Sequence, residues 1–218
     1  MKILVFLGSV RVSTPPAPAR LGMRVARACL RELQARWPDA ELLLVDPLAF
    51  VREPVFKPHF AYARRDVPAD LEQLAADIRS ADAYVMVSPE YNHSMSPALA
   101  DLLNHFGSSL FAFKPSAIVT YSAGQWGGAR AAVNMRTFLG ELGCLPVSAM
   151  IHVPAAHTVF DDEGEVAANQ PSQHWQDYMG RTFLQLHWWA EAARQQREQG
   201  GLPVAAFVTA PSQRNAPG

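Results

Sequence analysis

Short apolar runs alternate with stretches of helical periodicity along most of this chain. Short, largely apolar runs are typical of buried strands, whereas an apolar residue at every third or fourth position is typical of a helix with one buried side. Strands are predicted at 2–7, 41–45, 83–87, 116–121 and 146–151. Helices are predicted at 20–37, 69–81, 96–106, 129–142 and 172–198.

The alternation of strands and helices predicts an α/β fold in three layers. Parallel neighbours need a crossover helix between them, and strands buried on both faces are apolar throughout. We therefore expect a doubly wound, parallel, five-stranded sheet in the flavodoxin-like order 2-1-3-4-5, with ligands beyond the carboxyl ends of strands one, three and four. Residues 1–199 form one domain in this interpretation, and residues 200–218, rich in Gly, Pro, Ser and Asn, form a partly mobile tail.

Composition narrows the classes of partner. The 19 Lys and Arg residues nearly balance 20 Asp and Glu residues, so the net charge of -1 implies no basic face for nucleic acid. No apolar run approaches the roughly 20 residues that cross a bilayer, and the apolar start is too short for a secretory signal, so a cytoplasmic protein without membrane contact is expected. Cys29 and Cys144 are isolated, and the seven His residues lack metal-ligand spacing, so no metal site is predicted.

Polar residues gather in the loop after the first predicted strand, at 8–20. Ser9, Arg11 and Ser13 alternate there, and Arg20 stands where the first helix begins. Hydroxyl groups, guanidinium groups and the N-terminus of a helix together make a receptor for phosphate, although an ordinary polar surface loop would contain the same residues. Neither GxxxxGK[ST] nor GxGxxG follows the strand, which argues against a nucleoside triphosphatase and a dinucleotide-binding Rossmann site.

The loop after the fourth predicted strand, SAGQWGGAR at 122–130, has the composition of a site for a flat ring. Gly124, Gly127 and Gly128 let backbone N–H groups approach a planar ligand closely, and Trp126 would border that ligand. A glycine-rich turn without a ligand is the alternative interpretation.

Three segments at the expected ligand edge resemble the NADPH-dependent FMN reductase family of flavodoxin-like proteins. They are GSVRVS after the first strand, SPEYNHSMSPALADLL after the third and YSAGQWGGARAA at the end of the fourth. The resemblance spans about residues 2–150, and SPEYNHSMSPAL is its most specific part. It implies FMN as cofactor, NADPH or NADH as hydride donor, a small acceptor such as a free flavin, quinone, azo dye or metal oxyanion, and assembly as a homodimer or homotetramer.

The resemblance also implies which residues hold the cofactor. It assigns Ser9, Arg11 and Ser13 to the FMN phosphate, with Arg20 beside them at the start of the helix. The isoalloxazine ring and ribityl chain would lie along Pro89, Glu90, Tyr91 and Asn92, with Ser122 and Gly124 at the other end of the ring. Residues 14–19, TPPAPA, lengthen the phosphate loop relative to the family.

The implied reaction passes hydride from NAD(P)H through FMN to the acceptor. Because the flavin carries the chemistry, no catalytic side chain is predicted. Glu90 is interpreted as a hydrogen-bonding or subunit-contact residue in preference to a general base, and His93 as a solvent-side residue in preference to a proton donor. The alternative function is a flavodoxin-type one-electron carrier or a non-catalytic FMN-binding protein. Carriers of that type have a strongly acidic surface, which a net charge of -1 does not match.

Three further segments have structural interpretations. Ser96 and Pro97 suit the N-cap and the first position of a helix. The final helix carries more aromatic residues than one side of a sheet needs, and the family resemblance implies that a share of them lies in a subunit interface; they are Trp175, Tyr178, Trp188 and Trp189. The loop at 47–68 mixes aromatic, proline and charged residues and is interpreted as a lid or a contact with another subunit.

Overall fold

A computed structural model describes residues 1–11, 18–50 and 55–200 of the chain. Its sheet has the order β2-β1-β3-β4-β5, with β6 paired to β4, and every pair is parallel, so the predicted strand order is confirmed. The strands are β1 (Lys2–Leu7), β2 (Glu41–Val45), β3 (Ala83–Pro89), β4 (Pro115–Tyr121), β5 (Leu145–Pro146) and β6 (Ile151–Val153). The α-helices are α1 (Leu21–Arg36), α2 (Ala69–Ser80), α3 (Pro97–Asn104), α4 (Ser108–Phe111), α5 (Ala129–Glu141), α6 (Ala156–Val159) and α7 (Ser172–Gly200).

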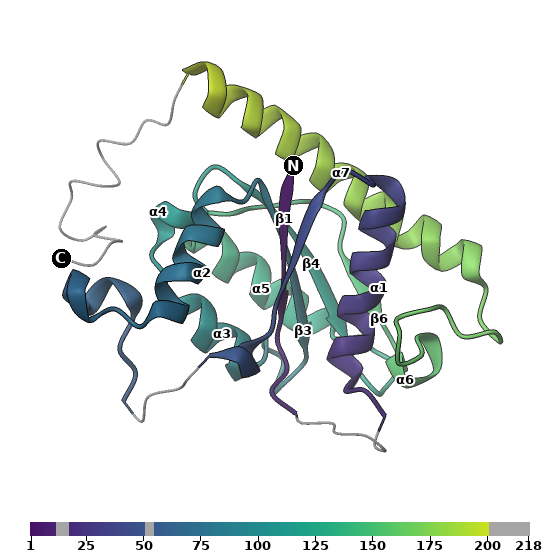
Figure 1. Cartoon of the computed structure of the whole chain (residues 1–218). Coiled ribbons are helices and arrows are strands. Elements are labelled where there is room, and N and C mark those ends of the chain that lie inside the picture. Colours follow the sequence, from purple (N-terminus) through teal and green to yellow (C-terminus); the bar gives the residue numbers. More distant parts are fainter. Residues whose placement is uncertain (12–17, 51–54, 201–218) are drawn as a thin grey trace.

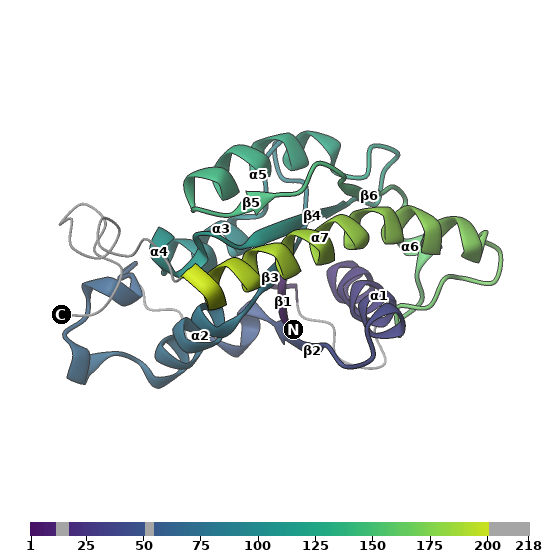
Figure 2. The ribbon, with the colours of Figure 1, turned by 90° about the horizontal axis from the view of Figure 1, so that it is seen from above.

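Helices cover both faces of the sheet (Figure 1). On one face, Val25, Cys29 and Leu33 of α1 share a core with Phe183 and Leu186 of α7. These two helices contact each other, as the view from above shows (Figure 2). Buried residues of α2, α3, α4 and α5 form the core on the other face. The predicted three-layer architecture is therefore confirmed.

The prediction of one continuous fifth strand at 146–151 is wrong. The structure has two short strands there, β5 beside the first residues of β4 and β6 beside its last residues. Between them, the Arg136 guanidinium donates to three consecutive carbonyls, and Gln185 Oε1 accepts from the Ala149 N–H at 3.0 Å. Because side chains of α5 and α7 satisfy these backbone groups, the chain can leave β4 without unpaired donors and acceptors.

The start of α3 has the cap that the sequence predicts. The Ser96 hydroxyl accepts from the Leu99 N–H at 3.1 Å, and Pro97 occupies the first helical position. The Ser96 N–H in turn donates to the Ser88 hydroxyl at 2.9 Å. This cap ties the beginning of α3 to the end of β3, beside the loop that follows Pro89.

Helix α7 continues to the last described residue, so the tail expected to be partly mobile lies outside the described residues beyond Gly200. Part of the loop after β2, 51–54, lies outside them as well. The described part of that loop packs on the same chain: the N–H of buried His59 donates to the His105 carbonyl at 2.8 Å, and its ring nitrogen lies 2.8 Å from Glu72 Oε2. Among the helices that the structure describes, none is long and apolar enough to cross a membrane.

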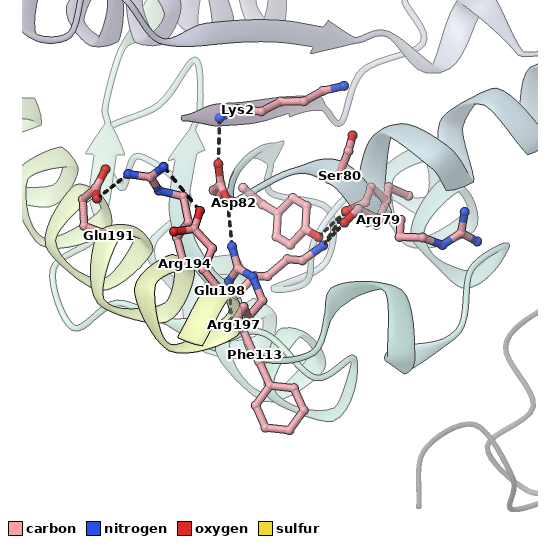
Figure 3. Close-up of polar contacts among 12 residues, drawn as sticks. Lys2, Arg79, Ser80, Asp82, Phe113, Glu191, Arg194, Arg197 and Glu198 are labelled. Carbon is pink, nitrogen blue, oxygen red and sulfur yellow. Dashed lines mark hydrogen bonds and ion pairs between the residues drawn. The ribbon is translucent and has the colours of Figure 1, made fainter. Parts of the chain in front are cut away.

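A polar cluster fastens the end of α7 to the amino ends of the strands, at the edge opposite their carboxyl ends (Figure 3). Asp82 lies just before β3, and its carboxylate accepts from the Lys2 backbone N–H at 3.0 Å and from Arg197 Nη2 at 2.6 Å. The side chains of Asp82 and Arg197 are both mostly buried. This ion pair joins the last turns of α7 to the residue before β3, and because it is mostly buried, salt screens it weakly.

Lys114, just before β4, caps the carboxyl ends of α2 and α4 from the same side of the molecule. Its ammonium donates to the carbonyls of Ile78, Arg79 and Leu110 at 2.7, 2.8 and 3.1 Å. These carbonyls belong to the last turns of the two helices, where backbone acceptors have no partner within the helix. Burial, and secondarily the charge of Arg197, lowers the pKa of Lys114 to about 7.

The contribution of Lys114 to stability should therefore rise between about pH 7 and about pH 10. Over that window the folded protein holds a neutral amine, whereas the unfolded chain, with an ordinary pKa of 10.5, holds the proton. Unfolding then takes up a proton, so the free energy of unfolding gains at most about 1.4 kcal/mol per pH unit from this residue. Urea unfolding at several pH values measures the slope, which Lys114→Met should flatten. Equal slopes for both proteins would contradict the lowered pKa.

Candidate functional site

The carboxyl ends of β1, β3 and β4 meet at one edge of the sheet. The first loop begins against β3, where the Gly8 N–H donates to the Val87 carbonyl at 2.7 Å. A Cβ at Gly8 would lie 2.7 Å from that carbonyl oxygen and 2.9 Å from Ser96 Oγ, so glycine permits this close approach. Ser9 follows and is buried. The first loop is thus fixed to the neighbouring strand at its first two residues.

Arg11 and Arg20, both predicted to hold phosphate, have different surroundings. Arg11 is exposed, and its Nη2 lies 3.4 Å from Tyr91 Oη in the segment after β3. The side chain of Arg20 is mostly buried, forms an ion pair with Asp46 after β2, and donates from Nη1 to the Ser9 carbonyl at 3.0 Å. Arg11 therefore faces the open edge of the site, whereas the guanidinium of Arg20 holds the loop.

The segment after β3 forms a tight turn. Tyr91 and Ser94 exchange two backbone hydrogen bonds, of 3.0 and 2.9 Å, and Asn92 and His93 between them have φ values of 49° and 63°. Positive φ at both central positions is the geometry of a type I′ turn, and Asn tolerates it better than most residues. The turn presents the exposed Tyr91 side chain beside Arg11.

Helix α5 holds this turn through two side chains one helical turn apart. Asn134 Oδ1 accepts from Ser94 Oγ at 2.9 Å, and Arg130 Nη1 lies 3.6 Å from Glu90 Oε1. The Arg130 guanidinium also lies over the ring of Trp126, 5.1 Å from its centroid. Glu90 Oε2 is buried and has no hydrogen-bond partner among the described residues. An unpaired buried carboxylate oxygen is costly, so it points to a donor group on a bound molecule.

The glycine loop, residues 122–128, is shaped by its own contacts. Ser122 Oγ donates to the Gly124 carbonyl at 2.8 Å and accepts from the Gly127 N–H at 3.0 Å. Gly127 and Gly128 both have positive φ. At Gly124, by contrast, an added Cβ would meet nothing within 4 Å, so the loop borders open space on this side. Backbone without side chains beside open space suits the flat face of a ring.

Tyr121 and Asp46 belong to this site although the sequence patterns did not single them out. Tyr121, the last residue of β4, is buried, and its hydroxyl lies beside the start of α1 and the first loop: a Cβ built on Gly22 would lie 2.5 Å from Tyr121 Oη and 3.0 Å from Ser9 Cβ. Asp46 directly follows β2 and forms an ion pair with Arg20. A Tyr in an apolar strand and an Asp before a Pro are common in proteins and do not by themselves indicate a binding site. Only their position at the carboxyl ends of two strands could have pointed to a role in the site.

The structure brings most of the predicted site residues to one edge of the sheet. Ser9, Arg11, Arg20, Pro89, Glu90, Tyr91, Asn92, Ser122 and Gly124 all lie in or beside these loops. Ser13 lies outside the described residues. These loops fit a ligand with an anionic end and a flat ring, as FMN has. Arg11 offers an exposed cation, Glu90 an unpaired carboxylate oxygen, and Gly124 open space beside backbone. Within residues 1–11, 18–50 and 55–200, no group of three or more His, Cys, Asp or Glu could hold a metal ion.

The chain matches a family model described as NADPH-dependent FMN reductase over residues 1–158. It is similar to an NAD(P)H-dependent FMN reductase of Pseudomonas aeruginosa, with 33% identity over 103 residues that cover 45% of this chain and 56% of the relative. It is also similar to a quinone reductase of Escherichia coli K12, with 43% identity over 75 residues that cover 33% of this chain and 40% of the relative. The chain thus spans about half the length of the curated relatives it matches.

A solved structure has the same fold. FerB, a flavoenzyme NAD(P)H:(acceptor) oxidoreductase from Paracoccus denitrificans, superposes with a TM-score of 0.66 at 19% identity, over 88% of this chain and 98% of that chain. This likeness confirms the flavodoxin-like fold. Because the family model covers most of the chain and the three loops with the family's motifs lie together at one edge of the sheet, the chain belongs to the NADPH-dependent FMN reductase family.

Proposed function

We propose that the protein is an FMN-dependent NAD(P)H oxidoreductase, which passes hydride from NAD(P)H through FMN to a flavin, a quinone or a similar small acceptor. The observation that carries the proposal is the convergence of three loops that offer one ligand a cation, an unpaired carboxylate oxygen and open space beside glycine backbone. Two similar proteins, named as an FMN reductase and a quinone reductase, support acceptors of this kind.

The phosphate of FMN would bind in the loop after β1. In this proposal Ser9, Arg11 and Ser13 contact the phosphate, and Arg20 supports their loop through its ion pair with Asp46. Hydrogen bonds to charged groups contribute roughly 1.5–3 kcal/mol each, whereas a micromolar complex needs about 8 kcal/mol after ordering costs. The other two loops therefore have to supply the rest of the affinity.

The ring and ribityl chain of FMN would lie between the turn after β3 and the glycine loop. The proposed contacts are Pro89, Glu90, Tyr91 and Asn92 on one side, and Ser122 and Gly124 on the other. Glu90 Oε2, buried and unpaired within the described part of the chain, would accept a hydrogen bond from a bound molecule. Ser122 would contribute indirectly, because the two hydrogen bonds of its hydroxyl fix the shape of the glycine loop.

When bound, FMN would supply the hydride-transfer chemistry, so the chain needs no nucleophile of its own. Its residues would hold the reacting molecules in position, which is itself a large part of catalysis. Arg130, which pairs with Glu90, also lies over the exposed ring of Trp126, and this ring would offer a surface for a planar donor or acceptor. We assign no side chain to proton transfer, and His93 is exposed on its turn.

Two measurements test the proposal on the purified protein. An absorption spectrum taken after mixing with FMN and removing free flavin should show bound flavin. NADPH or NADH should then be oxidised steadily when a quinone or free FMN is present. A protein that retains FMN but oxidises neither nucleotide would be a one-electron carrier or a binding protein, the alternative function. A protein that takes up no FMN would refute both functions.

Assembly as a homodimer or homotetramer is part of the same proposal. Trp188 and Trp189 of α7 are 62% and 43% exposed and form a T-shaped pair, with 4.7 Å between ring centroids. Leu184, one helical turn earlier, is 56% exposed. Exposed aromatic and aliphatic side chains on one helix suit a contact with a second copy. Light scattering at micromolar concentration should give a dimer or a larger species, and a monomer would remove this part of the proposal.

The proposed partners of the protein are small molecules, with neither nucleic acid nor a membrane among them. A net charge of -1 provides no general attraction to polyanions. The proposed location is the cytoplasm, because Cys29 and Cys144 are both free and buried, which suits a reducing compartment.

A further inference from the structure

An acidic hairpin at 160–166, directly after α6, lies on α1. Phe160 and Val166 pair across the hairpin in an antiparallel bridge, and Gly164 in its turn has a φ of +79°. A Cβ at Gly164 would lie 2.5 Å from the Ala28 nitrogen, so glycine lets the turn approach α1 closely. Three arginines of α1 form ion pairs with three carboxylates of the hairpin: Arg24 with Asp162, Arg27 with Glu163 and Arg31 with Glu165. The hairpin is therefore held on α1 by close packing and by charge.

One of these carboxylates, that of Asp162, also contacts the end of the loop after β1. Its Oδ2 accepts from the Ala19 N–H at 3.0 Å, and its Oδ1 lies 2.6 Å from Arg24 Nη2. Arg24, whose side chain is mostly buried, donates in turn from Nε to the Ala19 carbonyl at 3.0 Å. A single ion pair thus holds both polar groups of the Ala19 backbone, and the three contacts close a ring.

The contact at Ala19 is connected to the other end of the same loop. Ala19 directly precedes Arg20, whose Nη1 lies 3.0 Å from the Ser9 carbonyl and 3.4 Å from the Arg11 carbonyl. The ring around Ala19 therefore fixes the backbone from which Arg20 extends to the two residues that we propose contact the phosphate. The family model matches the chain only as far as residue 158, so Asp162 lies outside the matched part.

We propose that Asp162 is a positioning residue for the FMN phosphate, because it holds the Ala19 backbone from which Arg20 extends. This inference rests on the function proposed above. Asp162 acts on the loop proposed to bind phosphate, so it should affect only flavins that carry a phosphate. Riboflavin has the same ring and ribityl chain without the phosphate and is therefore a matched probe.

Quenching of flavin fluorescence gives the Kd of FMN and of riboflavin for the parent protein and for Asp162→Ala. The variant should bind FMN about three- to tenfold more weakly, the range of one net hydrogen bond, and should bind riboflavin as before. Measurement at about 0.5 M salt shortens the Debye length to about 4 Å, so the loss of a negative charge has little effect of its own.

Glu163→Ala is the matched control for this measurement. It removes the same charge from the same hairpin, but its carboxylate pairs with Arg27 and not with the Ala19 backbone. Both Kd values should therefore stay as in the parent. A second test uses Arg20→Met, which removes the connection from Ala19 to the start of the loop. Adding Asp162→Ala to that variant should change FMN binding little.

Several outcomes would overturn the inference. Equal weakening of FMN and riboflavin would assign Asp162 to packing alone. Unchanged FMN binding in Asp162→Ala, the same loss in Glu163→Ala, or full additivity with Arg20→Met would show that Asp162 does not position the loop through Ala19.

Folding of each variant is checked by circular dichroism and thermal unfolding. If Asp162→Ala does not fold, Asp162→Asn keeps the volume and offers one acceptor oxygen in place of two. It should give the selective loss of FMN, and an unselective loss would count against the inference. A parent protein that binds neither flavin would instead refute the proposed function, and the inference with it.

Discussion

Replacing Gly128 by alanine is expected to lower the free energy of unfolding by about 2–5 kcal/mol and to weaken FMN binding. Gly128 has a φ of +78°, a conformation that costs an L-residue about 1–2 kcal/mol. A Cβ there would also lie 2.8 Å from Thr120 Cβ and 3.3 Å from the Tyr121 backbone nitrogen. Crowding of a packed position typically costs about 1–3 kcal/mol more.

The effect of Gly128→Ala should extend to the site because this residue is the N-cap of α5. Arg130 and Asn134, in the first turns of α5, hold Glu90 and Ser94 of the turn after β3. A displaced start of α5 would therefore disturb the glycine loop and that turn together. Both would contribute to the flavin ring site in the proposed function.

Urea unfolding and FMN titration measure the two effects, with Gly140→Ala as the matched control. Gly140 lies near the end of α5, and a Cβ there would meet nothing within 4 Å. Alanine at that position should leave the Kd of FMN unchanged. It should raise the free energy of unfolding by up to about 1 kcal/mol, because glycine is the poorer helix former. Unfolding of Gly128→Ala at the parent midpoint would contradict the strain assigned to Gly128.

Gly22→Ala should weaken FMN binding by about tenfold or more and lower the free energy of unfolding by about 1–3 kcal/mol. The new Cβ would lie 2.5 Å from Tyr121 Oη, 2.9 Å from Leu7 Cδ1 and 3.0 Å from Ser9 Cβ. Relief of these contacts requires Tyr121 or Ser9 to move. Movement of Ser9 would displace the hydroxyl that we propose contacts the phosphate.

Tyr121→Phe in the Gly22→Ala background tests whether the Tyr121 hydroxyl is the group that alanine crowds. Removal of Oη relieves the shortest contact, so the double variant should recover part of the stability. Urea unfolding and FMN titration of both single variants and the double variant complete the cycle. A double variant no more stable than Gly22→Ala would show that the Tyr121 hydroxyl is not the group that alanine crowds.

The placement of the three loops could be predicted because it depends on local patterns. Continuous apolar runs indicate buried parallel strands, and the carboxyl ends of such strands lie at one edge of the sheet. Ser9, Tyr91 and Gly124 were expected near one another for this reason. The cap formed by Ser96 and Pro97 was predictable as well, since it depends on residues next to one another in the chain.

Contacts between distant segments could not be predicted in the same way. The position of Arg20 at the start of the first helix predicts a place beside the phosphate, but its ion pair with Asp46, which follows a different strand, cannot be inferred from that position. The fifth strand was predicted as continuous because its residues are apolar. It is interrupted because Arg136 and Gln185, from helices on opposite faces of the sheet, satisfy the backbone between β5 and β6.

Periodicity along the chain establishes the order of the elements and, together with the common doubly wound topology, predicts the order of the strands and the edge at which a ligand is expected. These properties follow from the buried faces of helices and strands and from the shared direction of parallel strands. Which side chains meet at that edge, such as Arg11 with Tyr91 and Arg130 with Glu90, is set only when the chain is folded. Each pair joins segments that are far apart in the chain, and their separation in space depends on packing that no local pattern records.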